Sequence, residues 1–255
     1  MRLRQVCLAA KELEPAVADL TAVLGLEVAY RDPMVMYFGL KNAVMPIGGD
    51  FLEVVAPVQE NTAAGRYLER RGGDGGYMLL FQCADALAER KRIETLGIRT
   101  VFTLDNPEYR ATHFHPRDTG GVLLSVDSVA PGADHLETMC MWDPGGPDWQ
   151  LAVRTDVVSA LVGAELQSED PAGLATLWAR ILGLQVTQGG SGEPCIQLRN
   201  GILRFVPAVD GRGTGVGGFD VKVADQLGLL GAAADRGCDH SDEQVVICGT
   251  RINLV

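Results

Sequence analysis

The chain has 255 residues, of which 47% are hydrophobic, and a formal net charge of −11. This length suits one large domain or two ordinary ones, and no apolar run approaches the ~18 residues of a membrane helix. The negative charge disfavours nucleic acid or an anionic membrane as a partner. The mixed first residues do not resemble a signal peptide, so we expect a cytoplasmic protein whose six cysteines, none in a CxxC pair, stay reduced.

The first predicted element is an apolar strand over residues 3–10. A helix is predicted within 14–28, because an acidic residue and Pro15 precede apolar residues at helical spacing and Leu24-Gly25 supplies a stop. Strand-like runs follow at 27–30, 35–40 and 51–56.

The same order of elements returns three more times. The next strands are predicted at 77–83, 160–167 and 218–223, the helices after them within 85–101, 170–186 and 225–238, and two further strand-like runs at 111–115 and 121–127. Repetition at this spacing indicates one supersecondary unit used four times. Pro- and Gly-rich residues 131–149 interrupt the pattern between the second and third copies.

The repeats predict an α+β fold of four βαβββ modules, paired into two half-barrel domains with the helices outside. Residues 1–130 would form the first domain, 131–156 a linker and 157–255 a second, degenerate domain. Side chains alternate along a strand, so residues two apart would share the wall of each concave cleft.

Two segments carry a family resemblance. Residues 51–57 (FLEVVAP) and 115–124 (HPRDTGGVLL) are similar to motifs of the vicinal-oxygen-chelate (glyoxalase) superfamily, and within it to the methylmalonyl-CoA epimerases most closely. The resemblance covers residues 3–128, whereas 157–255 resemble the superfamily through repeat shape only. It implies a half-open barrel in which four ligands hold a divalent metal.

The matching ligand positions are Gln5, Glu53, Met78 and Ser125. A thioether and a neutral hydroxyl are poor ligands for hard or borderline divalent ions, so we expect no cofactor. In the second half the matching positions are still poorer in donors: Gly163, Leu203 or Arg204, Phe219 and Asn253. The alternative is a divalent ion held by Gln5, Glu53 and His113.

Glu53 and His113 are the candidate catalytic residues. Glu53 interrupts a strongly apolar strand, and buried carboxylates are rare unless paired or functional; a structural anchor is the alternative. His113 and His115 lie two residues apart on a predicted strand and would share a face, which would place His113 near Glu53 as a general base. The alternative is that both histidines only form hydrogen bonds with the turn and solvent. Candidate ligand-binding residues are Gln5, Tyr37, Tyr77, Met78, His115 and Ser125.

Three functions remain open from the sequence. The preferred one is a metal-independent isomerase or lyase that acts beside a carbonyl or thioester. The second is a non-catalytic protein that sequesters a ligand, as in bleomycin-resistance relatives, and the third is a metal-dependent lyase, isomerase or dioxygenase with a rearranged site. The expected partner is a small molecule. An anionic molecule is favoured if the side chains of Arg66, Arg70 and Arg71 bind it at the cleft mouth instead of facing solvent. Either a monomer or a homodimer fits the four modules.

Overall fold

Four successive units of similar order make up the computed structural model, which describes residues 1–130 and 137–255. The first unit contains β1 (Arg2–Ala9), α1 (Leu13–Leu24), the 3₁₀ helix η1 (Pro33–Phe38), β2 (Leu40–Ile47) and β3 (Asp50–Pro57). Helix α2 (Ala63–Arg71) leads to the second unit: β4 (Gly75–Gln82), α3 (Ala86–Glu94), β5 (Thr100–Asp105), β6 (Tyr109–Phe114) and β7 (Leu123–Val129).

The last two units follow a crossover with two short 3₁₀ turns, η2 (Asp143–Gly145) and η3 (Trp149–Ala152). The third unit contains β8 (Val158–Ser168), α4 (Pro171–Leu182), β9 (Val186–Gln188), β10 (Pro194–Gln197) and β11 (Ile202–Pro207). The fourth contains β12 (Gly215–Val223), α5 (Gln226–Asp235), β13 (His240–Ser241), β14 (Gln244–Ile247) and β15 (Thr250–Leu254).

The helix signals in the sequence have direct structural counterparts. At the start of α4 the Asp170 side chain accepts a hydrogen bond from the Gly173 amide at 2.9 Å, and Pro171 occupies the first turn. Gly183 ends the helix with a φ of 66°, a conformation that favours glycine. Within the described residues, no helix is both long enough and apolar enough to cross a membrane.

Pairing of the units produces one 15-stranded sheet, and its two halves are called here the first and second sheets. In the first half the strand order is β2-β3-β1-β4-β7-β6-β5, and in the second it is β9-β10-β11-β8-β12-β15-β14-β13. The halves meet where β4 pairs with β12 through Gly76 and Val216. The predicted α+β, glyoxalase-like fold is therefore confirmed.

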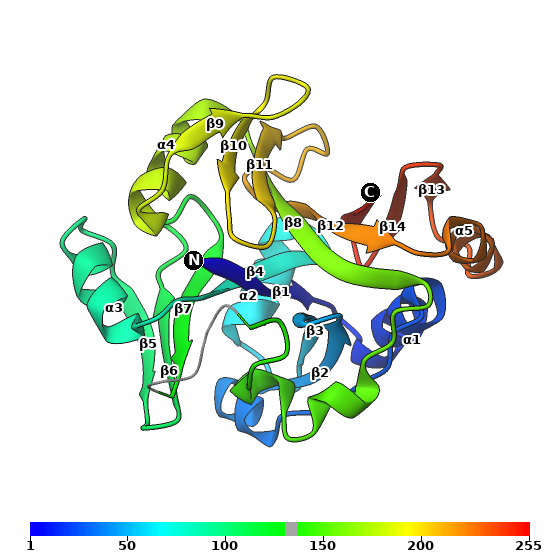
Figure 1. The fold of residues 1–255 in the computed structure, drawn as a ribbon, viewed down its shortest axis with the longest axis horizontal. Coiled ribbons are helices and arrows are strands. Elements are labelled where there is room, and N and C mark those ends of the chain that lie inside the picture. The colour runs from blue at the N-terminus through cyan, green and yellow to red at the C-terminus, as the bar shows by residue number, and fades with distance from the viewer. Residues whose placement is uncertain (131–136) are drawn as a thin grey trace.

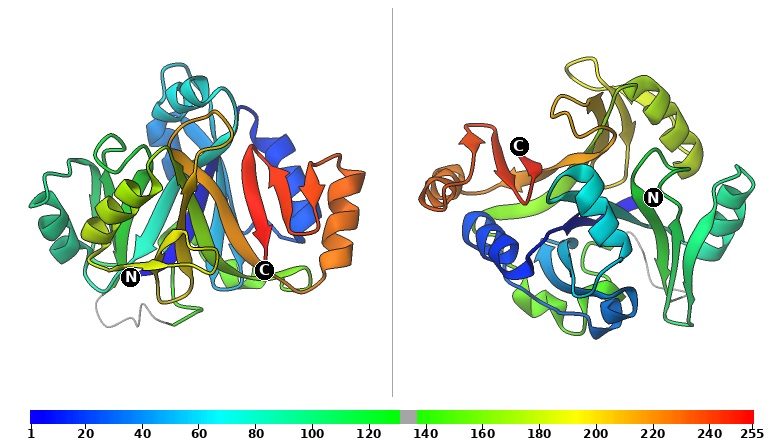
Figure 2. Two further views of the ribbon diagram at one scale, coloured as in Figure 1. Left: turned by 90° about the horizontal axis from the view of Figure 1, so that it is seen from above. Right: turned by 180° about the vertical axis from the view of Figure 1, so that it is seen from behind.

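The two faces of the first sheet bury different cores. Its convex face shares one hydrophobic core with helices α1, α3, α4 and α5 and with the second half, and these helices lie on the periphery of the molecule (Figures 1 and 2). Its concave face has a separate core that includes Phe51, residues of α2, and Trp142 and Trp149 from the crossover. The concave face is the place where the family resemblance puts the site.

The first unit departs from the predicted strand pattern. Residues 35–40, expected as a strand, fall mainly in η1, because Asp32 caps the Met34 amide at 2.8 Å, Pro33 starts the turn and Gly39 ends it with a φ of 70°. The expected strand at 27–30 is reduced to one bridge between Tyr30 and Val44. Strand β2 replaces them beside β3.

The predicted linker contributes to the first half. Residues 131–136 of it lie outside the described residues, while Trp142 and Trp149 are fully buried on the concave face. Both tryptophan rings pack beside Phe51 of β3, at centroid distances of 6.5 and 4.8 Å. The domain limits at 130 and 157 stay a prediction.

Candidate active site

A buried carboxylate lies at the floor of the concave face of the first half. Glu53 on β3 is 8% exposed, and its two oxygens accept hydrogen bonds from two side-chain amides. The Asn42 Nδ2 on β2 donates to Oε1 at 2.7 Å, and the Gln5 Nε2 on β1 donates to Oε2 at 2.9 Å. Gln5 was among the candidate ligand-binding residues predicted from the sequence, whereas Asn42 was not.

Both amides are held in one orientation by a second hydrogen bond. Asn42 Oδ1 accepts from the backbone N–H of Asp32 at 2.8 Å, and Gln5 Oε1 accepts from the indole N–H of Trp142 at 2.8 Å. Their N–H groups therefore point at Glu53. Burial raises the pKa of Glu53, and the hydrogen bonds from Asn42, Cys7 and Gln5 offset only part of that rise. A carboxylate with a raised pKa is a stronger base than an exposed glutamate.

An arginine fixes the crossover over this floor. The guanidinium of Arg4 is fully buried and lies 5.2–5.7 Å from the ring centroids of Phe51, Trp142 and Trp149. It donates to backbone carbonyls, including that of Cys140 at 2.7 Å. Burial lowers the pKa of Arg4 to about 10, so the group stays charged at neutral pH. Sequence analysis identified neither Arg4 nor the two tryptophans.

The side chains at the family's ligand positions do not fit a divalent ion. The oxygens of Gln5 and Glu53 accept N–H donors, Met78 offers a thioether, and the Ser125 hydroxyl donates to Asp127. Among the described residues, no three His, Cys, Asp or Glu side chains are grouped as a metal site.

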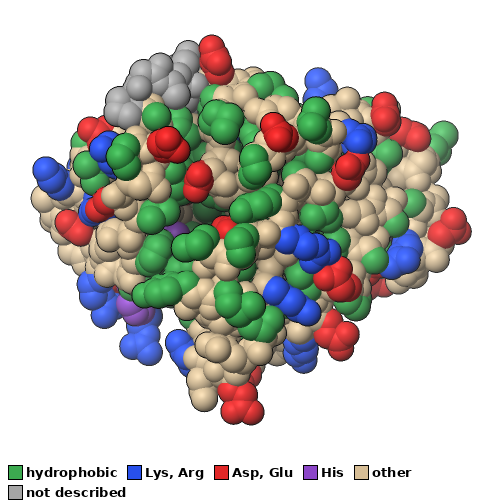
Figure 3. Space-filling model, turned by 90° about the horizontal axis from the view of Figure 1, so that it is seen from below, with side chains coloured by type: hydrophobic (Ala, Val, Ile, Leu, Met, Phe, Trp, Pro, Cys, Tyr) green, Lys and Arg blue, Asp and Glu red, His purple; other side chains and the backbone are tan. Residues whose placement is uncertain are grey.

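His113 lies on the same concave face but is not hydrogen-bonded to Glu53. Strands β1, β4 and β7 separate their strands in the sheet, and the His113 ring instead packs against Phe102 and Phe38, at centroid distances of 4.9 and 6.4 Å. Burial lowers the pKa of His113 to about 4, so its imidazole is neutral at pH 7. Seen from below Figure 1, the molecule has a hollow rimmed by hydrophobic side chains, with a histidine and an acidic side chain inside (Figure 3).

The other predicted site residues are dispersed. His115 lies beyond the end of β6, where its Nδ1 accepts from the Arg117 amide at 3.1 Å, so it serves the turn and does not share a strand face with His113. Tyr37 on η1 is 79% exposed at the mouth. Tyr77 packs against Tyr67 of α2 at 5.1 Å. Met78 and Ser125 are buried on the concave face.

A second buried carboxyl on this face was missed. Asp127 on β7 is fully buried and accepts a hydrogen bond from the Tyr109 hydroxyl at 2.7 Å and another from Ser125. Burial raises its pKa to about 7, against the effect of these hydrogen bonds. An acidic residue inside the apolar run 122–129 was the available signal, the same one that identified Glu53.

The arginines of α2 do not form an anion site at the cleft mouth. Arg71 is buried and donates to the carbonyl oxygen of Arg212 at 3.0 Å, in the loop before β12. It also lies 3.8 Å from the Asp210 carboxylate. Arg71 thus joins the two halves, whereas Arg66 and Arg70 are exposed.

The matching face of the second half is filled by ion pairs. Arg204 on β11 contacts Glu165 and Asp220, with donor–acceptor distances of 2.5–3.1 Å. Arg251 donates to Glu165 at 2.8 Å, and Asn253 donates to Asp220 at 2.7 Å. These side chains neutralise and bond one another, so this face presents a closed polar network.

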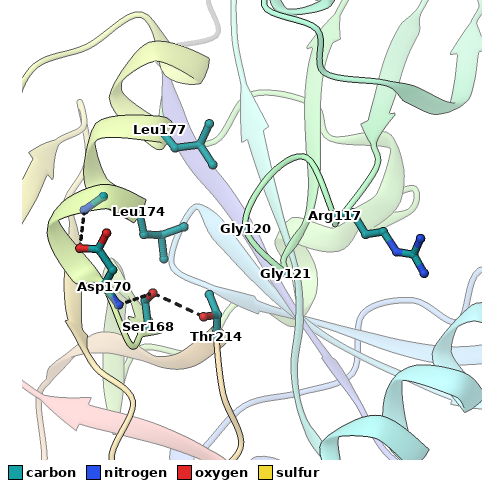
Figure 4. A pocket seen from close by; sticks show the side chains of 9 residues that line it. Arg117, Gly120, Gly121, Ser168, Asp170, Leu174, Leu177 and Thr214 are labelled. Carbon is teal, nitrogen blue, oxygen red and sulfur yellow. Dashed lines mark hydrogen bonds between the residues drawn. The ribbon is translucent and has the colours of Figure 1, made fainter.

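A shallow cavity of about 420 Å³ lies between the halves, away from Glu53. Figure 4 shows its apolar wall, Leu174 and Leu177 of α4, opposite Gly120 and Gly121, with Arg117 directed away. The Asp170 carboxylate there caps α4. We therefore place the candidate site at Glu53, a titratable group on the concave face that retains 8% exposure.

Comparison with known proteins identifies the family of the chain. A family model described as a glyoxalase-like domain matches residues 6–182. The ethylmalonyl-CoA/methylmalonyl-CoA epimerase of Cereibacter sphaeroides is 26% identical over 133 residues, covering 50% of this chain and 98% of the relative. A methylmalonyl-CoA epimerase structure from Mycobacterium tuberculosis is 25% identical, with a TM-score of 0.46, and the match covers 51% of this chain and 89% of that one.

The second half has a structural counterpart as well. A mutant of 4-hydroxymandelate synthase from Streptomyces coelicolor has a TM-score of 0.65 at 16% identity, covering 93% of this chain and 75% of that one. At this identity the likeness shows the fold alone, extended over both halves.

Proposed function

The chain belongs to the glyoxalase-like domain family, and from that premise we propose that it is an enzyme that moves a proton beside a carbonyl group without a metal ion, with Glu53 as the proton acceptor. The observation that carries the proposal is the Glu53 carboxyl itself. It is buried at the floor of the hollow, aligned by two amides and given a raised pKa by burial. This is the combination that tunes a carboxylate for general-base catalysis.

The chemical step needs no further reagent. The C–H bond next to the substrate carbonyl breaks, its proton moves to an oxygen of Glu53, and its electron pair moves onto the carbonyl oxygen as an enolate. Return of the proton to carbon gives an isomerised product, and loss of a leaving group from the neighbouring carbon gives a lyase reaction. The neutral imidazole of His113 carries one N–H and is the proposed donor to the enolate oxygen.

Metal independence is part of the proposal. It is supported by the donor chemistry at Gln5, Glu53, Met78 and Ser125, which suits amide and hydroxyl hydrogen bonds better than a divalent cation. Each of the two amides next to Glu53 already has its oxygen bonded to an N–H donor.

Solvent deuterium exchange tests this proposal. Chelator-treated protein is incubated in D₂O with a panel of ketones and acyl thioesters, including methylmalonyl-CoA because of the epimerase relatives, and label at the α-carbon is read by mass spectrometry. We expect Glu53→Gln to lower the exchange rate by about 10²–10⁴-fold. Glu60→Gln, at an exposed site, is the matched control. An unchanged rate in Glu53→Gln, or no exchange with any compound, would contradict the proposal.

A binding protein without turnover is the second candidate. The observation that favours it is the apolar mouth: Met34, Met36 and Tyr37 of η1 are 58–79% exposed, and such patches commonly mark binding sites. Calorimetry separates the two functions. Tight ligand binding that Glu53→Gln leaves unchanged, with no exchange at the ligand's α-carbon, would identify a sequestering protein.

A further inference from the structure

An aromatic cluster joins the two modules of the first half. Phe38 on η1 contacts Phe102 on β5 edge to face, with ring centroids 5.1 Å apart. Phe102 contacts the His113 ring at 4.9 Å, and Tyr37 lies 5.2 Å from Phe38. These four residues, which we name the aromatic clasp, come from both modules of the first half and are far apart in sequence.

The clasp faces the same side of the sheet as Glu53. Phe102 and His113 are opposite each other in the β5–β6 pair, so their side chains share a face. His113 follows Ala111 and Tyr109 at alternate positions, and both of these belong to the concave core. Residues Met34, Met36, Tyr37 and Phe38 of η1 are 38–79% exposed, an arrangement that costs free energy unless a partner covers it.

The charges of the concave face exclude a carboxylate next to the reacting carbon. Glu53 and Asp127 are the acids that the described strands place there. Burial raises the pKa of the Cys7 thiol and of the Tyr109 hydroxyl on the same face, so both are neutral, and burial also keeps His113 neutral at pH 7. Arg4 is the cation nearest the floor, and its donors are directed at the carbonyls of Gly49, Thr138 and Cys140. A substrate carboxylate would therefore be desolvated beside Glu53 without a cationic partner.

We propose that the substrate is an uncharged carbonyl compound with a flat aromatic ring, which lies against Phe38 and Phe102 while the carbonyl faces Glu53 and the N–H of His113. This inference rests on the proposed function and specifies its substrate class. Flat rings gain offset or edge-to-face contacts with an aromatic wall beyond simple burial. The clasp residues are then determinants of specificity, with Glu53 as the reacting group.

Three small probes test the inference on the full chain. Acetophenone is uncharged and aromatic, benzoylacetate adds a carboxylate to the reacting carbon, and cyclohexyl methyl ketone lacks the flat ring. Binding is followed by NMR of ¹³C-methyl methionine, because Met34 and Met36 lie next to the clasp on η1. We expect acetophenone to bind more tightly than either comparison compound. Removal of one ring, in Phe102→Ala or Phe38→Ala, should weaken the binding of acetophenone by about 2–12-fold.

The control and the contradicting results are specific. Leu227→Ala removes an 86% exposed apolar side chain on α5 and should leave acetophenone binding unchanged. Equal or tighter binding of benzoylacetate, no saturable binding of acetophenone, or unchanged binding in both clasp variants would overturn the inference. Glu53→Gln should retain acetophenone binding. A failure of the proposed proton transfer would therefore be seen in the deuterium-exchange assay. The order of binding affinities among the three probes tests the substrate class alone.

Discussion

Two acidic side chains, Glu53 and Asp127, are buried on one concave face, and each accepts hydrogen bonds from neutral donors only. Buried carboxylates without a cationic partner are costly in the ionised form. Glu53 borders the hollow, which makes its raised pKa useful for chemistry. Asp127 is fully buried beneath Tyr109 and Ser125, so its raised pKa affects stability instead.

Asp127 predicts a specific dependence of stability on pH. Its pKa in the folded protein is about 7, against roughly 3.9 in an unfolded chain. The folded state binds the proton more tightly between these values, so this group's contribution is greatest below pH 4, falls as pH rises towards 7 and is constant above that. Asp127→Asn should reduce the slope of the unfolding free energy against pH by up to about 1.4 kcal/mol per pH unit. Urea unfolding from pH 4 to 8 measures this slope.

The matched control for this measurement is Asp105→Asn. Asp105 pairs with Arg90 near the surface, which lowers the Asp105 pKa, so its contribution changes only at the acid end of the range. Equal slopes for wild type and Asp127→Asn would contradict the assignment.

At the scale of elements, the crossover between the halves is part of the candidate site. Arg2 and Arg4 hold it through backbone carbonyls at Glu137 and Cys140, each at 2.7–2.8 Å. Its two tryptophans fill the space over Phe51, and Trp142 also orients the amide of Gln5. The crossover thus decides how much of the hollow stays open and how Glu53 is bonded.

The two tryptophans predict different costs for the same substitution. Trp142→Phe removes the donor to Gln5 and leaves a buried amide oxygen unbonded, which should cost about 1–3 kcal/mol of unfolding free energy. Among the described residues Trp149 Nε1 has no hydrogen-bond partner, so Trp149→Phe leaves no buried acceptor unbonded and should cost less than Trp142→Phe. Chemical denaturation measures both; a larger loss for Trp149→Phe would be inconsistent with this arrangement.

The elements were predictable where local signals define them. Asp170-Pro171 and Leu182-Gly183 mark the ends of α4 in the sequence itself. In contrast, 40–47 (LKNAVMPI) does not alternate, because β2 is buried over nearly its whole length, so Asn42 was missed with its strand. Burial of Trp142 and Trp149 depends on a chain reversal onto β2 that no local pattern encodes. Glu53 was recognisable because an acid interrupts an apolar strand.

At the scale of the whole molecule, the two halves are joined through one core. Trp178 of α4 packs against Phe81 of β4 at 6.0 Å, and its indole N–H donates to the Thr119 carbonyl at 2.9 Å. The first half presents a carboxylate to a hollow, whereas the second closes the equivalent face with ion pairs between Arg204, Glu165 and Asp220. The second half therefore supports the first, in which the proposed chemistry is located.

The central claim is that the Glu53 carboxylate acts as a base without a metal ion. Calorimetric titration of Mn²⁺, Co²⁺ and Zn²⁺ into chelator-treated wild type and Glu53→Gln tests it most directly. The account predicts the same heats for both proteins, with no saturable one-to-one binding at Glu53. A stoichiometric transition in wild type that disappears in Glu53→Gln would contradict it.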